Sequence, residues 1–170
     1  MVINKDTDIV LKVPEEKDME ILEKWYGMHD YFGHATGFKN FSDISSKFKE
    51  PVDPSILSFM IYNIKTGIPI GFIYGYLKDA SRNSVLWISI FIIDPAFQNK
   101  GYGTHALNKL LDLAKREYGI AACIVAVSYK NKQGLSFWEK VGFSHDPELE
   151  QSLHHFGTSQ AAIMKKIIKQ

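Results

Sequence analysis

A loop with two glycines, at residues 98–104, has the spacing that points most clearly to chemistry. It follows an unbroken apolar run at residues 85–93 and precedes a segment whose apolar residues recur at i, i+3 and i+4. Gly101 and Gly103 let the backbone come close to a ligand and adopt φ values that a Cβ disfavours. A helix that begins at these glycines directs its unpaired N–H groups and the positive end of its dipole at one point. The pattern predicts a pyrophosphate cradle made of Gln98, Asn99, Lys100, Gly101, Tyr102, Gly103 and Thr104.

Two common phosphate-binding motifs do not fit this loop. The dinucleotide fingerprint needs a third glycine where this chain has Ala106, and the nucleotide triphosphate loop needs Gly-Lys-Ser/Thr after four spacer residues. A pair of glycines also serves as an ordinary strand-to-helix turn. The glycines alone therefore leave a binding loop and a plain turn as alternatives.

A second block of residues makes the pattern more specific. Residues 98–103 resemble the Gln/Arg-x-x-Gly-x-Gly/Ala loop of the Gcn5-related N-acetyltransferases (GNAT), which holds the pyrophosphate of acetyl-CoA. Residues 131–143 are similar to that family's Asn-x-x-Ala-x-x-x-Tyr-Glu-Lys-x-Gly-Phe segment, and the match extends over residues 57–143. The resemblance implies acetyl-CoA as cosubstrate and direct acetyl transfer, in a ternary complex, to a primary amine of a small molecule or protein N-terminus.

The resemblance also implies roles outside the glycine loop. The backbone of Phe91, Ile92 and Ile93 is expected to pair with pantetheine where the strand splays open at a bulge. Asn131 matches the residue that reaches the pantetheine arm, although Asn is also a favoured N-cap for the following helix. Trp138 stands where the family usually has the tyrosine that serves as general acid.

This departure at Trp138 leaves the proton donor open. An indole N–H donates a hydrogen bond but does not release a proton near neutral pH, so Trp138 is expected to hold the thioester sulfur or form a pocket wall. Three alternatives follow: the thiolate leaves unassisted, Tyr129 or Ser136 assists it, or the protein is a regulatory module that binds the cofactor with little turnover.

The base that deprotonates the amine is equally open. Residues 85–93 contain no Asp or Glu, although many relatives place a carboxylate on that strand. Ser89 on the strand, and His34 with His29 and Asp30 in the segment that shapes the acceptor site in relatives, are the candidates. The spacing of the histidines, including His154 and His155, predicts no metal site.

Shorter segments, at residues 23–25, 68–71 and 91–95, resemble the aminoglycoside 6′-N-acetyltransferases. Those enzymes usually carry an acidic residue at the position of Ser89, and its loss removes the obvious partner of a polycationic drug. Antibiotic acetylation stays an alternative beside polyamine, metabolite and protein N-terminal acceptors. A group of aromatic residues lines an acceptor pocket or packs in the core: Trp25, Tyr26, Tyr31, Phe32, Phe38 and Phe41.

Length and composition favour one domain over residues 1–170, with 45% hydrophobic residues and a length suited to a single core, and the resemblance implies that this is an N-acetyltransferase domain. A net charge of +1 gives no global field that would draw the protein to nucleic acid or an anionic membrane, and the resemblance implies a small-molecule or peptide amine as partner. The absence of a signal-like run and the single Cys123, expected to pack in the core, suit the cytoplasm. The family resemblance is compatible with a homodimer.

The elements that position these residues follow from periodicity. Strands are expected at residues 8–13, 56–64, 68–77, 85–93, 120–128 and 161–168, and helices beginning at residue 14, at the glycines and at residue 131. Residues 120–128 are predicted to form a strand that is covered on both faces and pairs parallel with residues 85–93. Gly142 is predicted to cap the helix that begins at residue 131. Residues 27–54 are expected to form a folded loop with a short helix. The pattern predicts an α/β fold, a central mixed sheet with helices on both faces, and the resemblance implies that this fold is of GNAT type.

Overall fold

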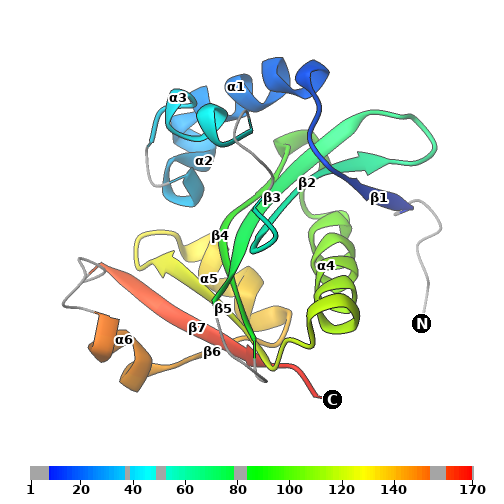
Figure 1. Cartoon of the computed structure of the whole chain (residues 1–170). Helices are drawn as coiled ribbons and strands as arrows, with labels where there is room; N and C mark the ends of the chain where they lie inside the picture. Colours follow the sequence, from blue (N-terminus) through cyan, green and yellow to red (C-terminus); the bar gives the residue numbers. More distant parts are fainter. Residues whose placement is uncertain (1–7, 37–38, 49–52, 79–83, 154–159, 170) are drawn as a thin grey trace.

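A computed structural model describes residues 8–36, 39–48, 53–78, 84–153 and 160–169. Within these residues, seven strands form one sheet in the order β1-β2-β3-β4-β5-β7-β6 (Figure 1). The strands are β1 (Ile9–Lys12), β2 (Ile56–Asn63), β3 (Pro69–Lys78), β4 (Val85–Ile93), β5 (Ala122–Ser128), β6 (Ser144–His145) and β7 (Ala161–Ile167). The predicted mixed α/β sheet is confirmed.

The sheet changes from antiparallel to parallel at its centre. Strands β1 to β4 form an antiparallel meander, and β5 pairs parallel with β4. Helix α4 (Tyr102–Tyr118) makes this possible, because it carries the chain from the end of β4 back to the start of β5. Strand β7 then lies antiparallel between β5 and β6. The expected parallel strand at residues 120–128 is therefore present.

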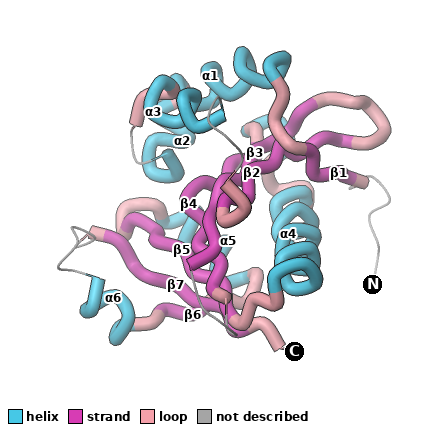
Figure 2. The backbone as a smooth tube through the Cα atoms, viewed as in Figure 1, coloured by secondary structure: helices cyan, strands magenta, loops and turns pink. Residues whose placement is uncertain are grey.

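Helices cover both faces of the sheet (Figures 1 and 2). The α1 side carries η1 (Glu16–Asp18), α1 (Met19–Gly27), α2 (His29–Thr36), α3 (Ser42–Ser45) and η2 (Ser46–Phe48). The α4 side carries α4 and α5 (Lys132–Lys140). The short helix η3 (Pro95–Phe97) leads from β4 toward α4, and α6 (Pro147–Leu153) contacts β7.

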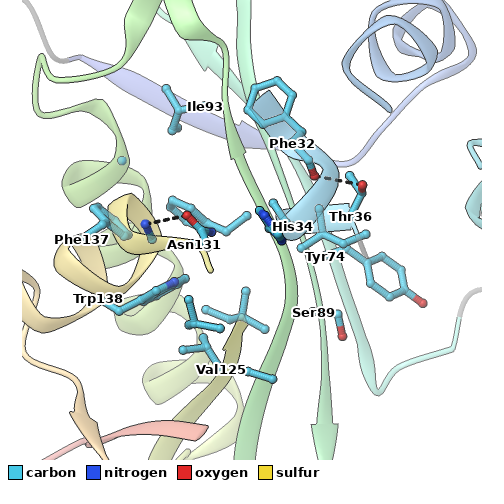
Figure 3. Close-up of a pocket in the computed structure, with 18 of the residues that line it drawn as sticks. Phe32, His34, Thr36, Tyr74, Ser89, Ile93, Val125, Asn131, Phe137 and Trp138 are labelled. Atoms are coloured by element: carbon cyan, nitrogen blue, oxygen red, sulfur yellow. Dashed lines mark hydrogen bonds between the residues drawn. The ribbon is translucent and has the colours of Figure 1, made fainter. Parts of the chain in front are cut away.

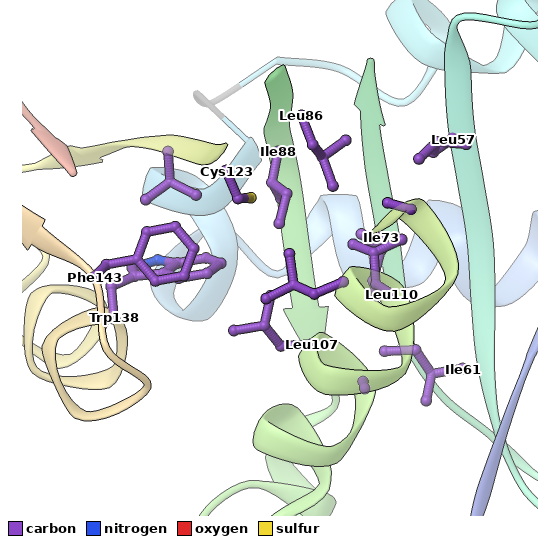
Figure 4. Packing of buried hydrophobic residues seen from close by; sticks show 14 of the residues in the cluster. Leu57, Ile61, Ile73, Leu86, Ile88, Leu107, Leu110, Cys123, Trp138 and Phe143 are labelled. Atoms are coloured by element: carbon purple, nitrogen blue, oxygen red, sulfur yellow. The ribbon is translucent and has the colours of Figure 1, made fainter. Parts of the chain in front are cut away.

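The core consists of two clusters, one on each face. Neighbouring residues of a strand point to opposite faces, so Phe72 packs on the α1 side and Ile73 on the α4 side. Figure 4 shows Leu107 and Leu110 of α4 directed at the strands. The apolar stripe predicted for this helix is buried at every position: Ala106, Leu107, Leu110, Leu111 and Ala114. Cys123 is also fully buried, and burial raises the pKa of its thiol to about 12, as expected for a packing residue.

A β-bulge at Ser89 changes which side chains of β4 point to each face of the sheet. The register with β3 shifts between Tyr74 and Gly75, so Ser89 has no partner of its own. Before the bulge, the side chains of even-numbered residues such as Leu86 and Ile88 face the α4 side. After the bulge, the side chains of odd-numbered residues such as Phe91 and Ile93 face that side. Only glycine fits at position 75, because a Cβ there would lie 2.7 Å from a carbonyl oxygen of β4. The bulge thus lies at Ser89, ahead of residues 91–93 where it was expected.

Strands β4 and β5 separate at this bulge. Their pairing ends with Ile88 opposite Val125, whereas β5 continues to Ser128 paired with β7. Among the described residues no strand pairs with the β5-facing edge of β4 beyond Ile88. The centre of the sheet is therefore open at this end.

Some elements differ from the expectation. Residues 27–54 contain α2, α3 and η2 where one short helix was expected, and neither β6 nor α6 was expected. Strand β6 has two residues, too few for an alternating pattern to be visible in the sequence. Of the helices in the described ranges, none combines the length and apolarity needed to cross a bilayer.

Candidate active site

A cavity of about 1200 Å³ lies where β4 and β5 separate (Figure 3). Its α4–α5 half is lined by the loop after β4, by α4 and α5 and by the end of β5, and its α2–α3 half by residues of α1, α2, α3 and β3. Nine of the residues expected to hold the cofactor line the first half: Phe91, Ile93, Gln98, Asn99, Gly101, Gly103, Thr104, Asn131 and Trp138. Ile92, Lys100 and Tyr102 do not line the cavity.

The N-terminus of α4 opens onto this cavity. Gly101 is its N-cap, with φ 87° in the left-handed region, and Asn99 two residues earlier also has a positive φ of 58°. The first backbone hydrogen bond of the helix runs from the His105 N–H to the Gly101 carbonyl at 3.1 Å, so the amides before it have no acceptor within the helix. With the positive end of a 17-residue helix dipole, these amides can bind an anion.

Gly103 is required for a different reason than expected. It lies inside the first turn of α4, and no positive φ is found there. A Cβ on Gly103 would lie 3.2 Å from the ring of Phe137 in α5. The glycine therefore allows α4 and α5 to pack closely beside the cavity, whereas Gly101 supplies the left-handed turn.

The loop between β4 and α4 is held by its own side chains. Gln98 donates from Nε2 to the Ile93 carbonyl at 2.8 Å, and Gln133 donates to Gln98 Oε1 at 3.3 Å. Lys100 donates from Nζ to the Ala96 carbonyl at 2.8 Å, which directs the ammonium back onto the loop.

Tyr102 is buried and points away from the cavity lining. Its hydroxyl accepts a hydrogen bond from Asn63 Nδ2 at 3.1 Å, and Asn63 also accepts from the amides of Lys65 and Thr66 in the β2–β3 turn. Tyr102 therefore anchors the start of α4 to the meander.

The open edge of β4 presents alternate residues to the gap. The Asp94 N–H donates to the Ile70 carbonyl at 2.8 Å, so even-numbered residues here direct their backbone groups to β3. Phe91 and Ile93 consequently direct their backbone N–H and C=O groups into the gap. The backbone groups of Ile92 face β3, and its side chain is buried on the α1 side. The expected backbone contact to pantetheine is thus available from Phe91 and from the N–H of Ile93, whose carbonyl already accepts from Gln98, but not from Ile92.

Asn131 caps α5 at the edge of the cavity. Its Oδ1 accepts from the Gly134 N–H at 2.9 Å, and a Cβ on Gly134 would lie 2.4 Å from Asn131 Nδ2. The same residue lines the cavity (Figure 3). The N-cap role is confirmed, and it leaves the Asn131 side chain beside the space where a ligand would lie.

The sequence model of the acetyltransferase (GNAT) family matches residues 20–143 of the chain. The chain belongs to the GNAT acetyltransferases. An uncharacterised N-acetyltransferase of Methanocaldococcus jannaschii is 29% identical over 80 residues, which cover 45% of this chain and 35% of that protein. The chain thus spans about a third of the length of the curated relative it matches.

Solved GNAT structures share the architecture. The spermidine N-acetyltransferase of Vibrio cholerae, in complex with CoA and spermine, matches with a TM-score of 0.71 and 14% identity over 94% of this chain and 95% of that one. The aminoglycoside acetyltransferase AAC(6′)-Ib, in complex with CoA, matches with a TM-score of 0.67 and 16% identity over 94% and 95%. At these identities the likeness shows the GNAT fold, and the predicted family, fold and enzyme class are confirmed.

Trp138, at the position where GNAT enzymes usually have tyrosine, belongs to a cluster of rings. It is 7% exposed, and its ring centroid lies 5.4 Å from that of Phe91, 5.1 Å from Phe137 and 4.9 Å from Phe143. Figure 3 shows its nitrogen-bearing edge on the side of Val125. Trp138 therefore forms a wall of the cavity and also part of the core.

Three of the remaining candidates for proton transfer line the cavity. His34 of α2 and Ser89 at the bulge are exposed there, and Ser136 of α5 lines the opposite half. Figure 3 shows His34 between Asn131 and Tyr74, near the boundary of the two halves. His29 and Asp30 are exposed but do not line the cavity.

Tyr129 lies outside the cavity lining. Its hydroxyl donates to Glu150, which is also paired with His145 and accepts from the Ile163 N–H at 3.2 Å. The hydrogen bond to Glu150 raises the pKa of Tyr129. Burial raises the pKa of Glu150, but the hydrogen bonds from Tyr129, His145 and Ile163 together outweigh it and lower that pKa to about 2. Tyr129 thus stabilises α6 against the sheet.

The aromatic group divides between the two expected roles. Tyr26, Tyr31 and Phe32 line the α2–α3 half, whereas Trp25 and Phe41 pack in the core, and Phe38 lies outside the described residues. Sequence reasoning missed other lining residues of this half: Lys39, Asp43, Lys47, Asp53, Tyr74 and Tyr76. Tyr74 and Tyr76 stand two residues apart in β3, a spacing that places both on one face.

In the part of the chain that the structure describes, no three His, Cys, Asp or Glu side chains are grouped so that they could hold a metal ion. His154 and His155 lie outside the described residues.

Proposed function

We propose that this protein transfers the acetyl group of acetyl-CoA directly to a primary amine within a ternary complex. One observation carries the proposal: the left-handed cradle before α4 and the unpaired edge of β4 open onto the same cavity. An anion site and a strand-like edge side by side match a ligand that carries a pyrophosphate and an amide-containing arm.

The residues present fit acetyl-CoA. The amides at the start of α4 would hold the pyrophosphate, because Gly101 turns the backbone and Gly103 admits the close packing of α5. Backbone groups of Phe91 and Ile93 would pair with the pantetheine amides, with Asn131 beside them. The cosubstrate supplies an acetyl thioester, whose carbonyl carbon is the point of attack.

His34 is the residue we propose to receive the proton of the amine. A primary amine has a pKa of about 10.4 and arrives mostly protonated at neutral pH, so a group that accepts its proton is needed. Imidazole titrates closest to neutrality, and His34 lies near the boundary of the two halves, on the α2–α3 side. As the new C–N bond forms and the C–S bond breaks, an N–H on the free edge of β4 would stabilise the carbonyl oxygen.

We propose that the thiolate leaves without a proton donor. Trp138 has no proton to release near neutral pH, and Tyr129 is bonded to Glu150 away from the cavity lining. An ordinary thiol has a pKa of about 8.5, which makes a thiolate a fair leaving group. Ser136 lines the cavity but is a far weaker acid than the departing thiol.

Calorimetric titration with acetyl-CoA tests the proposal. Wild-type protein is expected to bind with micromolar affinity, and Gly101→Glu is expected to lose binding because a side chain and a negative charge enter the cradle. Gly119→Glu is the matched control, since Gly119 is the left-handed glycine at the other end of α4. A folded wild-type protein that does not bind acetyl-CoA would overturn the proposal.

The role of His34 has its own readout. His34→Ala is expected to lower kcat/KM at neutral pH by about 100-fold and to move the acidic limb of the pH profile toward the pKa of the amine, so that activity recovers at alkaline pH where the amine deprotonates unaided. Ser89→Ala, at the other exposed candidate, is expected to keep the limb. An acidic limb at the same pH in His34→Ala as in wild type would exclude His34 as the base.

A regulatory module that binds acetyl-CoA with little turnover is the second candidate, because tryptophan replaces the tyrosine expected at position 138. Release of CoA in the presence of amines distinguishes the two functions. Binding without release for any amine would favour the module.

A further inference from the structure

The hydroxyl group of Tyr26 in α1 is buried. The side chain is 3% exposed, its hydroxyl has no hydrogen-bond partner among the residues that the structure describes, and the residue lines the α2–α3 half of the cavity. Burial, with smaller effects of Tyr74 and Asp43, raises the pKa of this phenol. The group therefore stays protonated and can donate. A buried donor without an acceptor is unfavourable, so a ligand that supplies the acceptor would be selected here.

The walls around Tyr26 are aromatic. Phe32 of α2 and Tyr74 of β3 are both buried and both line this half (Figure 3). Tyr31 and Tyr76 line it as well. Rings on several sides of a cavity favour a flat or apolar body over a hydrated polyol or an extended polyamine.

The charges of this half do not suit a polycation. Among its described lining residues are two lysines, Lys39 and Lys47, and two aspartates, Asp43 and Asp53. Both carboxylates already accept local hydrogen bonds: Asp43 from the Asn40 N–H at 3.1 Å, and Asp53 from the Ser55 N–H at 2.8 Å and hydroxyl at 2.7 Å.

A lysine also occupies the aromatic wall. The Nζ atom of Lys47 lies 5.3 Å from the ring centroid of Tyr74, so a second cation on that ring would meet like charge. Several ammonium groups would thus meet no net negative charge among these residues, since two lysines balance the two aspartates, and one lysine already lies on the Tyr74 ring.

We infer that the acceptor is a monoamine with an aromatic body and a neutral hydrogen-bond acceptor, which binds with that acceptor against the Tyr26 hydroxyl and its amine toward the β4–β5 gap. Polyamines and aminoglycosides are disfavoured. The inference rests on the proposed function, because it names the substrate class of the same site.

Two amines that differ by one hydroxyl group test it. With acetyl-CoA, wild-type protein is expected to acetylate tyramine with a kcat/KM roughly tenfold above that for phenethylamine, and both above spermidine and kanamycin. Tyr26→Phe is expected to abolish the preference for tyramine while phenethylamine is turned over as before. Tyr118→Phe, on the half-exposed tyrosine at the end of α4, is the matched control and is expected to keep the preference.

The outcomes separate this inference from the proposed function. Faster turnover of spermidine or kanamycin, equal turnover of the two arylalkylamines, or a preference that survives in Tyr26→Phe each overturns the inference and leaves the acetyltransferase function intact. Binding of acetyl-CoA without acetylation of any of the four amines also overturns it. Failure to bind acetyl-CoA, read by calorimetry on the same protein, would instead overturn the proposed function.

Discussion

The indole Nε1 of Trp25 donates a hydrogen bond to Oδ2 of Asp94 at 2.8 Å, across 69 positions of sequence. Trp25 is fully buried in α1, and Asp94 follows the last residue of β4. The other carboxylate oxygen of Asp94 accepts from the Ala96 N–H at 2.9 Å and so caps η3, the short helix before the loop at residues 98–104. One carboxylate thus ties α1, beside the α2–α3 half of the cavity, to the segment that leads from β4 to α4.

Removing this contact is expected to lower stability. Trp25→Phe and Asp94→Ala each lose the hydrogen bond, at a cost of about 1–3 kcal/mol in the free energy of unfolding because the remaining partner is at least half-buried, and Trp25→Phe also loses packing in the core. The double variant is expected to lose less than the sum of the two, with a coupling of about 1 kcal/mol. Urea denaturation of the four proteins measures the cycle, and strictly additive losses would show that the bond contributes nothing.

The two left-handed glycines of α4 provide a matched pair. Gly101 has φ 87° at the N-terminus and Gly119 has φ 60° at the C-terminus, where a Cβ would meet nothing within 4 Å. Gly101→Ala and Gly119→Ala are both expected to lower the free energy of unfolding by about 1–2 kcal/mol, the cost of a left-handed alanine.

Only the change at Gly101 is expected to affect the ligand. Its acetyl-CoA affinity should fall by about tenfold, because the strained turn directs the amides of the cradle, whereas Gly119→Ala should bind as wild type. Calorimetry of both variants is the measurement. Equal acetyl-CoA affinities for Gly101→Ala and Gly119→Ala would show that Gly101 is not part of the binding site.

Glu150 should make stability depend on acid pH. Its pKa in the folded protein is about 2, against an ordinary value of 4.5. A carboxyl whose pKa is depressed on folding stabilises the protein above the ordinary value, and this contribution is lost as pH falls from about 4.5 toward about 2. Glu150→Gln is therefore expected to flatten the decline of stability in that window.

Urea denaturation at several acidic pH values measures this dependence. At neutral pH, Glu150→Gln is expected to unfold more easily by about 2 kcal/mol, since charged hydrogen bonds are lost. Glu148→Gln, on an exposed residue of the same helix, is the control and should leave the profile unchanged. An identical acid profile for Glu150→Gln and wild type would contradict the role of the Tyr129, His145 and Glu150 group.

Trp138→Phe tests the unassisted departure of the thiolate. The phenyl ring keeps much of the packing against Phe91, Phe137 and Phe143 but has no N–H. Turnover is expected to stay within about threefold of wild type, because a group that cannot release a proton is not the general acid. Single-turnover kinetics with saturating acetyl-CoA give the comparison. A loss of about 100-fold or more would mean that the indole N–H acts on the thioester.

Local patterns in the sequence predicted most elements of this fold. Helix α4 carries its stripe at 3.6-residue spacing, Gly101 adopts the left-handed turn that its place before a helix suggested, and Gly142, with φ 94°, ends α5 as expected. Each depends on residues within a few positions of one another, so the sequence alone contains the information.

Other features depend on partners far along the chain. The bulge at Ser89 lies opposite the Tyr74–Gly75 step of β3, where Gly75 allows the close approach of the Trp87 carbonyl, and that bulge decides that Phe91 rather than Ile92 shares a face with Ile88. Lys100 and Tyr102 belong to the predicted loop, yet Lys100 bonds back to the loop and Tyr102 turns to Asn63.

The sequence by itself thus determined the family, the order of most strands and helices, and the glycine cradle, because these arise from short-range periodicity and from backbone preferences of single residues. Only the tertiary structure decided where β4 parts from β5, which backbone edge faces the gap, and which tyrosines reach the cavity. Strand register and side-chain direction are set by pairing and packing between segments tens of residues apart, and no local pattern encodes that pairing.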